Sequence, residues 1–286
     1  MPEPLLVGRE LTFRYGKQSA PIFSNLSLTV EEGETVLLMG PSGCGKSTLA
    51  YCLAGLYPEY AGELAGTVRL AGRPLESYGP AARARTVSIL FQNPDNQFCM
   101  DRVDHEVLFA LENINYPGDL RARMDELLEL AGLRELAQAP IRTLSGGTKQ
   151  KLALCTALAT GARLLILDEP TAPLTNAEID ILFRVLAKLK ADGISMIYIS
   201  HRLEEVFRMC DKITVLRDGQ IAAARVNAAR CSSSDGSVSS GRPRNFSVRQ
   251  TASRSGIYCR PWLRRTMNLG RIISVFFTGR VRSRRG

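Results

Sequence analysis

The stretch Gly40-Pro41-Ser42-Gly43-Cys44-Gly45-Lys46-Ser47 decides the fold of this chain. It fits the pattern GxxxxGK[ST] in full. Glycines let successive backbone N–H groups curl around a polyphosphate, where a side chain would block the approach. The stretch follows a short apolar run, Thr35 to Met39, and opens a segment of helical spacing from Lys46. This context favours a strand–loop–helix nucleotide site over a chance glycine-rich turn.

Each residue type in this stretch suits a phosphate ligand. Lys46 is placed to reach the β and γ phosphates, and the Ser47 hydroxyl is placed to bind Mg²⁺. A helix that begins at Lys46 aims its positive end at the same anion, so Thr48 on its first turn joins the predicted site. We interpret Cys44, inside the loop, as a small filler and not a nucleophile. We therefore predict ATP and Mg²⁺ as the cofactors.

A second segment, Leu164-Leu-Ile-Leu-Asp168-Glu169, supplies acids for the same site. Four consecutive aliphatic residues indicate a buried strand, and the acids at its carboxyl end then face the nucleotide. Asp168 is placed to hold Mg²⁺ through water, and Glu169 to polarise the attacking water. The alternative is a strand that happens to end in a solvated acidic turn, which the phosphate loop makes much less attractive.

The segment Leu144-Ser145-Gly146-Gly147-Thr148-Lys149-Gln150 identifies the class of ATPase. Ser145 alone could simply cap a helix. Together with the two glycines, however, it gives free N–H groups at a helix start, 23 residues before Asp168. With these motifs the chain resembles the ATP-binding cassette (ABC) family of ATPases. In that family, Ser145, Gly146 and Gly147 would face the γ-phosphate that is held by a partner subunit.

The resemblance also assigns expected roles to three further residues. Tyr15 matches the aromatic that stacks on the adenine, although it could be an ordinary strand tyrosine. Gln92 matches the glutamine that contacts Mg²⁺ and water and links the site to a membrane subunit. His201 matches the histidine that touches the γ-phosphate. With Glu169, we expect Gln92 and His201 to form the catalytic group, and Gln92 to join Ser47 and Asp168 at the metal.

The order of strands and helices predicts an α/β fold. Buried strands alternate with helices, which indicates a mostly parallel sheet with helices on both faces. The resemblance makes this a P-loop NTPase (RecA-like) core with an antiparallel β edge and a helical ABC subdomain. We expect the ATPase domain to span 1–226, with the helical insert at about 97–144.

A sharper resemblance lies in Phe91-Gln92-Asn93-Pro94-Asp95-Asn96-Gln97 and the helix that follows it. This stretch is similar to the ATPases of energy-coupling-factor importers, which take up vitamins and metal ions. The segment 200–207, Ser-His-Arg-Leu-Glu-Glu-Val-Phe, also occurs in sugar-importer ATPases. The resemblance implies integral membrane transport subunits and a second ABC ATPase chain as partners, in a homodimer or a heterodimer. A soluble ABC ATPase that acts on nucleic acid or ribosomes is the alternative, but no long coiled-coil insertion separates Ser47 from Ser145.

One position departs from the family pattern. An Asp usually stands in the loop after the catalytic Glu, where this chain has Thr175 in Thr171-Ala-Pro-Leu-Thr175. That Asp helps connect the two nucleotide sites of a dimer. If its loss weakens their coupling, Thr175→Asp should raise the rate of ATP turnover.

Charge and composition limit the other readings. The chain has 286 residues and a net charge of +9. Residues 227–286 hold thirteen Arg, no Lys and one acid, which leaves 1–226 with a net charge of −3. The negative charge of 1–226 therefore argues against a nucleic-acid-binding domain. Seven cysteines without a CxxC pair predict reduced thiols. No apolar stretch approaches the ~20 residues needed to span a bilayer, and the acidic start is no signal peptide, so we expect a peripheral protein on the cytoplasmic face of the membrane.

The arginine-rich tail, 227–286, has a composition unlike that of the predicted domain. Its like charges repel, and its few apolar residues cannot offset the ~1–2 kcal/mol of backbone entropy that each ordered residue loses. We expect it to be disordered and dispensable for the ATPase fold. Arg without Lys is what an out-of-frame reading of a GC-rich gene would give. The alternative is a genuine basic arm that binds anionic lipid or nucleic acid.

Overall fold

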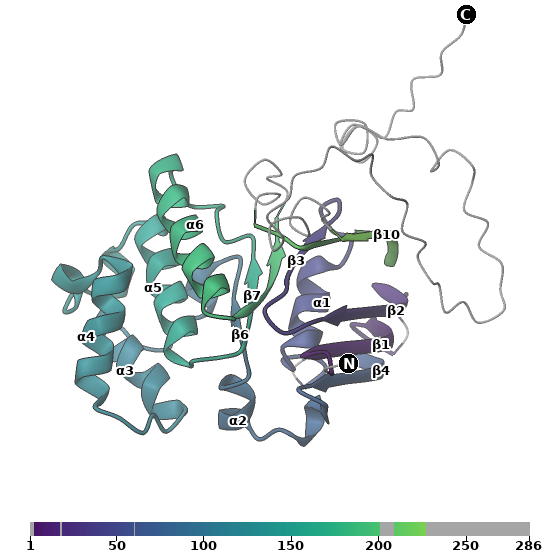
Figure 1. The fold of residues 1–286 in the computed structure, drawn as a ribbon, viewed down its shortest axis with the longest axis horizontal. Helices are drawn as coiled ribbons and strands as arrows, with labels where there is room; N and C mark the ends of the chain where they lie inside the picture. The colour runs from purple at the N-terminus through teal and green to yellow at the C-terminus, as the bar shows by residue number, and fades with distance from the viewer. Residues whose placement is uncertain (1–2, 18, 60, 201–208, 227–286) are drawn as a thin grey trace, which may run out of the picture. The chain divides into compact units, whose positions relative to one another are not determined.

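The computed structural model describes residues 3–17, 19–59, 61–200 and 209–226 (Figure 1). The described residues all belong to the first of the chain's two units, Met1–Asn227. The prediction of a disordered tail at 227–286 lies outside the described residues, as does His201.

A six-stranded sheet forms the centre of the first unit, in the order β10-β9-β3-β8-β7-β6. The pairs from β9 to β6 are all parallel, and only β10 runs antiparallel to its neighbour β9. The central strands are buried on both faces, which explains their continuous aliphatic runs. The strand bounds are β3 (Thr35–Met39), β6 (Val87–Leu90), β7 (Leu164–Asp168), β8 (Ser195–Ile199), β9 (Lys212–Arg217) and β10 (Gln220–Val226).

Helices cover both faces of this sheet, because alternate side chains of each strand point to opposite sides. Ile166 of β7 packs in a cluster with α1 (Lys46–Leu53). Its neighbour Leu167 packs in a different cluster with α5 (Gly146–Ala159) and α6 (Asn176–Ala191). In Figure 1, α1 accordingly lies on one side of β3 and β7, and α5 and α6 lie on the other. The sheet therefore separates the helix of the phosphate loop from the helix that begins after Ser145.

An antiparallel sheet supplies the predicted β edge. Its order is β2-β1-β4-β5, with bounds β2 (Phe23–Val30), β1 (Leu6–Arg14), β4 (Glu63–Leu70) and β5 (Arg73–Pro74). Phe13 of β1 stacks on Phe23 and on Tyr57, with ring centroids 6.0 and 5.4 Å apart. These rings join the cluster that contains Leu49 and Leu53 of α1. The antiparallel sheet thus packs against the same helix that the phosphate loop begins.

The remaining helices form a separate cluster with α5. Val107 of α3 (Val103–Asn113) and Leu128 of α4 (Leu120–Ala131) are fully buried against Leu152 of α5. The other short elements are α2 (Pro80–Ala84), η1 (Leu75–Ser77), η2 (Pro94–Asn96), η3 (Arg134–Leu136) and η4 (Ile141–Thr143). The predicted α/β architecture, with a mostly parallel sheet, an antiparallel edge and helices between them, is confirmed.

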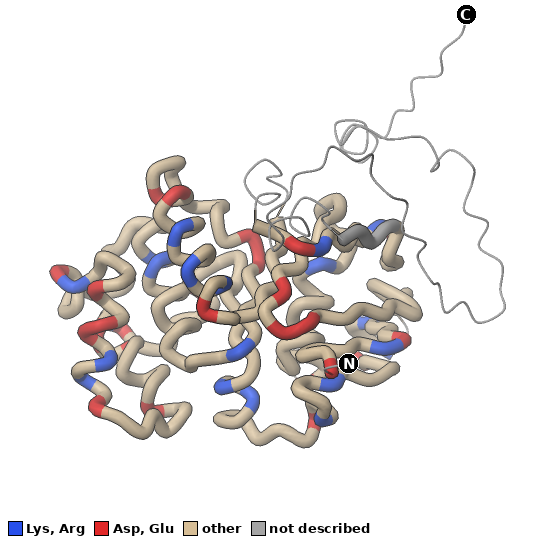
Figure 2. The backbone as a smooth tube through the Cα atoms, viewed as in Figure 1, with Lys and Arg blue, Asp and Glu red and all other residues tan. Residues whose placement is uncertain are grey.

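Surface and redox features agree with the composition. Among the described residues, no helix is both long and apolar enough to cross a membrane. Basic and acidic residues are both spread over the described backbone (Figure 2). Cys44, Cys52, Cys99 and Cys155 are free thiols, as predicted, whereas Cys231 and Cys259 lie outside the described residues.

Candidate active site

The predicted site residues follow the carboxyl ends of neighbouring parallel strands. The phosphate loop follows β3. Asp168 is the last residue of β7, and Glu169 comes directly after it. Ser200 follows β8, which lies between those two strands, and Gln92 follows β6 at the end of the row. Because parallel strands share their direction, these residues meet at one edge of the sheet, where open α/β sheets bind ligands.

The phosphate loop has the backbone shape that the motif requires. Gly43 has a φ of 78°, which favours glycine, and a Cβ on it would meet nothing within 4 Å. Gly45 has a φ of 97°, and a Cβ on it would lie 2.8 Å from Cγ2 of Ile22. The first position therefore leaves open space at the loop, and the second is restricted by packing.

Lys46 lies inside the curve of this loop. Its ammonium donates hydrogen bonds to the carbonyl oxygens of Gly40, at 2.9 Å, and Pro41, at 3.0 Å. The side chain is only 9% exposed. A buried cation is thus held within the loop 40–47, where it could bind an anion.

Asp168 is a buried carboxylate without a hydrogen-bond partner. It is fully buried, and neither carboxylate oxygen has a partner among the described residues. Burial raises the pKa of Asp168, and the neighbouring charge of Glu169 acts in the same direction. The Ser47 hydroxyl lowers the pKa of Asp168, although the hydroxyl is not within hydrogen-bond geometry of either carboxylate oxygen. A buried, unsatisfied carboxylate beside a hydroxyl therefore requires an explanation.

A divalent cation would provide that explanation. Mg²⁺ prefers oxygen ligands and binds through one or two carboxylates together with substrate phosphates. The oxygens of Asp168 and Ser47 are of the required type and lie beside the phosphate loop. The residues present thus fit a Mg²⁺ ion that is bound together with a nucleotide.

Glu169 is held at a sharp change in backbone direction after β7. Its N–H donates to the carbonyl of Ile199 on the adjacent strand, at 3.0 Å. Its φ of 48° is uncommon for a residue other than glycine and costs about 1–3 kcal/mol, a type of strain that clusters at functional sites. The side chain is half-buried at the same edge of the sheet as Lys46.

Tyr15 lies beside the start of α1. Its hydroxyl hydrogen-bonds with that of Thr48, at 2.8 Å, and its ring packs edge-on against Phe13 and Tyr57. The side chain is 47% exposed. An exposed aromatic face next to the phosphate loop is compatible with the predicted adenine contact.

Ser145, Gly146 and Gly147 lie at the start of α5, as predicted. Ser145 is the N-cap residue, and its Oγ accepts from the N–H of Thr148 at 3.2 Å. Ser145 and Gly146 are exposed. Because α5 and α1 cover opposite faces of the sheet, this segment belongs to a different surface from the phosphate loop of the same chain.

The loop after β6 is fastened to α5, which the sequence did not predict. Gln92 itself is exposed. Gln97 donates to the carbonyl of Ala153, at 2.8 Å, and to Oγ1 of Thr156, at 2.9 Å. Asp95 forms an ion pair with Lys149 at 2.7 Å. Gln97 was part of the motif quoted above, but only the fold shows that its amide reaches the helix after Ser145.

Thr175 has a structural role that the sequence reading missed. It is the N-cap of α6 and forms a capping box with Glu178, in which each side chain bonds the backbone N–H of the other residue. Thr175-x-x-Glu178 is the sequence signature of such a box, so this signal was available. An Asp at this position could cap the helix too, but its side chain could not donate a hydrogen bond to Glu178, as the Thr175 hydroxyl does.

Comparison with known proteins agrees with this geometry. A model of the ABC transporter family matches residues 23–172, just over half of the chain. The putative HMP/thiamine import ATP-binding protein YkoD of Bacillus subtilis is 40% identical over 223 residues, or 75% of this chain and 40% of that protein. The ribose import ATP-binding protein RbsA of Lacticaseibacillus paracasei is 39% identical over 205 residues, or 69% of this chain and 40% of that protein. The chain thus spans about two fifths of the length of these curated relatives.

A solved structure matches over most of its length. The cbiO1 protein of Clostridium perfringens, part of the ABC transporter complex cbiONQ, superposes with a TM-score of 0.67 at 26% sequence identity. The alignment covers 81% of this chain and 92% of that protein. The likeness therefore extends beyond the motifs to the arrangement of the whole cassette.

Proposed function

This chain belongs to the ABC transporter family of ATP-binding cassettes, and from that premise we propose that it binds and hydrolyses ATP to power a membrane importer. The observation that carries the proposal is the buried, unpartnered Asp168 carboxylate beside the phosphate loop. A fold that served only as a scaffold would gain nothing from this group, because an unsatisfied buried carboxylate opposes folding. A nucleotide site with a bound cation puts it to use.

Binding of ATP uses the loop 40–47. The N–H groups of the loop and the positive end of α1 receive the polyphosphate. Lys46 exchanges its hydrogen bonds to the Gly40 and Pro41 carbonyls for the β and γ phosphates. Ser47, Asp168 and Gln92 would hold Mg²⁺, which would offset phosphate charge. Tyr15 and Thr48 complete the site, Tyr15 against the adenine and Thr48 on the first turn of the helix.

Hydrolysis requires a water that is polarised and directed at the γ-phosphate. Glu169 follows β7 directly after Asp168, and its backbone is fixed by the bond to Ile199, so it is held beside Asp168. A carboxylate there accepts a hydrogen bond from the attacking water and orients it. Gln92 and His201 assist by contacting this water and the γ-phosphate.

A complete site needs a second chain. Ser145, Gly146 and Gly147 present a helix N-terminus, which binds anions, but on the surface away from the phosphate loop of their own chain. We place this segment against the γ-phosphate bound by a partner cassette, which is either a second copy of this chain or a different ABC subunit. ATP binding then closes the pair, and hydrolysis opens it.

The loop 92–97 and the helical insert form the docking surface for integral membrane subunits, at the cytoplasmic face. The loop is exposed at Gln92, Asn93 and Asn96, yet it is tied to α5 through Gln97 and Asp95. A membrane subunit that moves this loop would therefore also move the start of α5. The resemblance of 91–97 and the likeness to cbiO1 favour an energy-coupling-factor importer of vitamins or metal ions. The sequence similarity to RbsA keeps a sugar importer as the alternative.

Site-specific crosslinking tests the docking surface. A photo-crosslinking residue at Asn96 should capture an integral membrane subunit in cells, and the captured subunit should identify the transporter type. The matched control places the same residue at the exposed Asp180 of α6, where no capture is expected. Capture of membrane subunits from Asp180 and not from Asn96 would overturn this docking surface.

A further inference from the structure

The segment after Glu169 lies directly on the start of α5. A Cβ on Gly146 would lie 3.4 Å from the Cβ of Pro173, and a Cβ on Gly147 would lie 2.9 Å from both carboxylate oxygens of Glu178. Gly147 itself is buried. The two glycines of the Ser145–Gly147 segment thus allow close approach by the loop that follows the catalytic acid.

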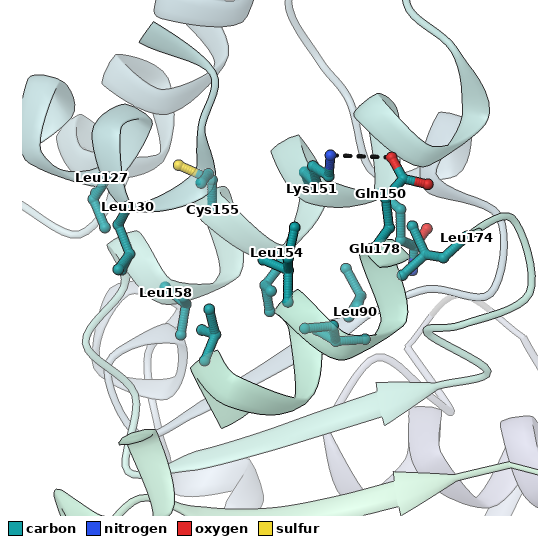
Figure 3. Close-up of a pocket in the computed structure, with 14 residues that line it drawn as sticks. Leu90, Leu127, Leu130, Gln150, Lys151, Leu154, Cys155, Leu158, Leu174 and Glu178 are labelled. Carbon is teal, nitrogen blue, oxygen red and sulfur yellow. Dashed lines mark ion pairs between the residues drawn. The ribbon is translucent and has the colours of Figure 1, made fainter. Parts of the chain in front are cut away.

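The carboxylate of Glu178 bridges that loop and α5. One oxygen accepts from both the N–H of Thr175, at 3.0 Å, and its hydroxyl, at 2.9 Å. The other oxygen forms an ion pair with Lys151 of α5 at 3.0 Å. Figure 3 shows this ion pair among the side chains that line the apolar pocket between α4, α5 and α6. Glu178 therefore links the loop at Thr175 to the helix at Lys151, and it leaves no room for a side chain at Gly147.

The bridge depends on the charge of Glu178 and on the side chain at position 175. The Thr175 N–H, the Lys151 ammonium and the Thr175 hydroxyl together lower the pKa of Glu178, so the carboxylate is charged at neutral pH. Lys151 and Glu178 are 30% and 22% exposed, so their contact is partly shielded from water. An acid in place of Thr175 would set a second carboxylate against the first and remove a donor. The Thr at this position thus adds a hydroxyl donor to the bridge that an Asp side chain could not supply.

We propose that Glu178, held between Thr175 and Lys151, is a positioning residue that fixes the Ser145–Gly147 segment relative to the loop after Glu169. This inference rests on the proposed function, in which those two segments of one chain serve two different ATP sites. Glu169 acts on the nucleotide of its own chain, and Ser145–Gly147 acts on that of the partner. Glu178 then transmits a displacement at one site to the other, in place of the Asp that usually stands at Thr175.

The first experiment separates ATP affinity from turnover in the full chain. Glu178→Gln keeps a capping-box acceptor at this position but loses the charge, and Lys151→Met keeps the length of the stem but loses the ammonium. Each should lower ATP turnover about 3- to 10-fold and leave ATP affinity unchanged, and the double variant should be no worse than either. Lys151→Arg should restore turnover. Arg83→Met, which removes an ion pair to Glu59 from a comparably exposed side chain on α2, is the matched control and should leave turnover unchanged. Wild-type turnover in Glu178→Gln and Lys151→Met would overturn the inference.

The second experiment tests whether Glu178 acts on the partner's site. A mixture of Glu178→Gln with Lys46→Ala chains contains pairs in which an intact phosphate loop faces an intact Ser145–Gly147 segment. The mixture should therefore turn over more ATP than the mean of the two variants measured separately. Ser145→Ala mixed with Lys46→Ala is the reference, because it tests only the shared site of the proposed function. Recovery in the reference alone would contradict the inference. Recovery in neither mixture would contradict a site shared by two copies of this chain, which belongs to the proposed function.

Discussion

The unpartnered carboxylate of Asp168 predicts that the nucleotide site is built at the expense of stability. We expect Asp168→Asn to stabilise the nucleotide-free protein. The side chain is fully buried and neither oxygen has a hydrogen-bond partner among the described residues. Asn has nearly the same shape, so the packing is kept while the charge is removed.

The size of the effect follows from the burial. An unsatisfied buried polar group costs about 1–3 kcal/mol, and a charged one costs more. Asn remains polar, so we expect it to recover only about 1–2 kcal/mol of this cost. For a domain of this size, each kcal/mol shifts the melting temperature by about 2–4 °C, which gives a rise of roughly 2–8 °C.

The pH dependence has a definite sign. Because burial raises the pKa of Asp168 in the folded state, the wild-type protein loses stability as the pH rises through that pKa. Asp168→Asn does not titrate there. The gap between the two melting temperatures should therefore widen as the pH is raised from the acid range towards neutrality.

Thermal unfolding with and without Mg²⁺ and ATP is the assay. Ligand at 100 times its Kd adds about 2.7 kcal/mol to the stability of the wild-type protein. Asp168→Asn should gain less, so its advantage should shrink or reverse with ligand. Asp180→Asn on the exposed face of α6 is the matched control and should change neither curve. A nucleotide-free Asp168→Asn protein that melts at or below the wild-type temperature would refute the reasoning.

Three further predictions follow from the loops and the tail. Thr175→Asp should lower the ATP turnover of the purified protein, because it places a second carboxylate against Glu178. This is contrary to the expectation from the family pattern, and a rise in turnover would show that the usual acid improves this chain. Gln97→Ala should leave basal ATP turnover within about twofold of wild type. It should reduce the stimulation of turnover by membrane subunits in reconstituted vesicles, because the loop 92–97 loses its bonds to α5. Unchanged stimulation would contradict the coupling of this loop to α5. A 1–226 truncation should fold and hydrolyse ATP like the full chain, and a truncated protein that fails to fold would show that the 227–286 tail contributes to the domain.

The sequence predicted the fold well where a motif fixed the backbone. The strand–loop–helix around Lys46 and the strand that ends at Asp168 are local features, because their residue types are dictated by phosphate approach and by burial. The antiparallel strands of the first 70 residues were only outlined. Their partners lie far apart in the chain, as in the pairing of Val7 with Arg69, and alternation alone does not reveal such pairs.

The links between the motifs were not predictable from spacing. Gln97 and Thr156 are 59 residues apart, and Asp95 and Lys149 are 54 residues apart. Each motif could be assigned a ligand because phosphate and metal chemistry are local. Which motif touches which depends on how α5 packs against the sheet, and that is a property of the tertiary fold.

The most direct test of the central claim is ATP turnover and ATP binding by the purified chain and its Glu169→Gln and Lys46→Ala variants. The wild-type protein should hydrolyse ATP only with Mg²⁺. Glu169→Gln should bind ATP, fail to turn it over and associate into an ATP-dependent pair, because it keeps the shape of the site and loses the group that polarises water. Lys46→Ala should bind ATP weakly, because its phosphate contact is gone. Full turnover by Glu169→Gln, or undiminished ATP binding by Lys46→Ala, would contradict the account.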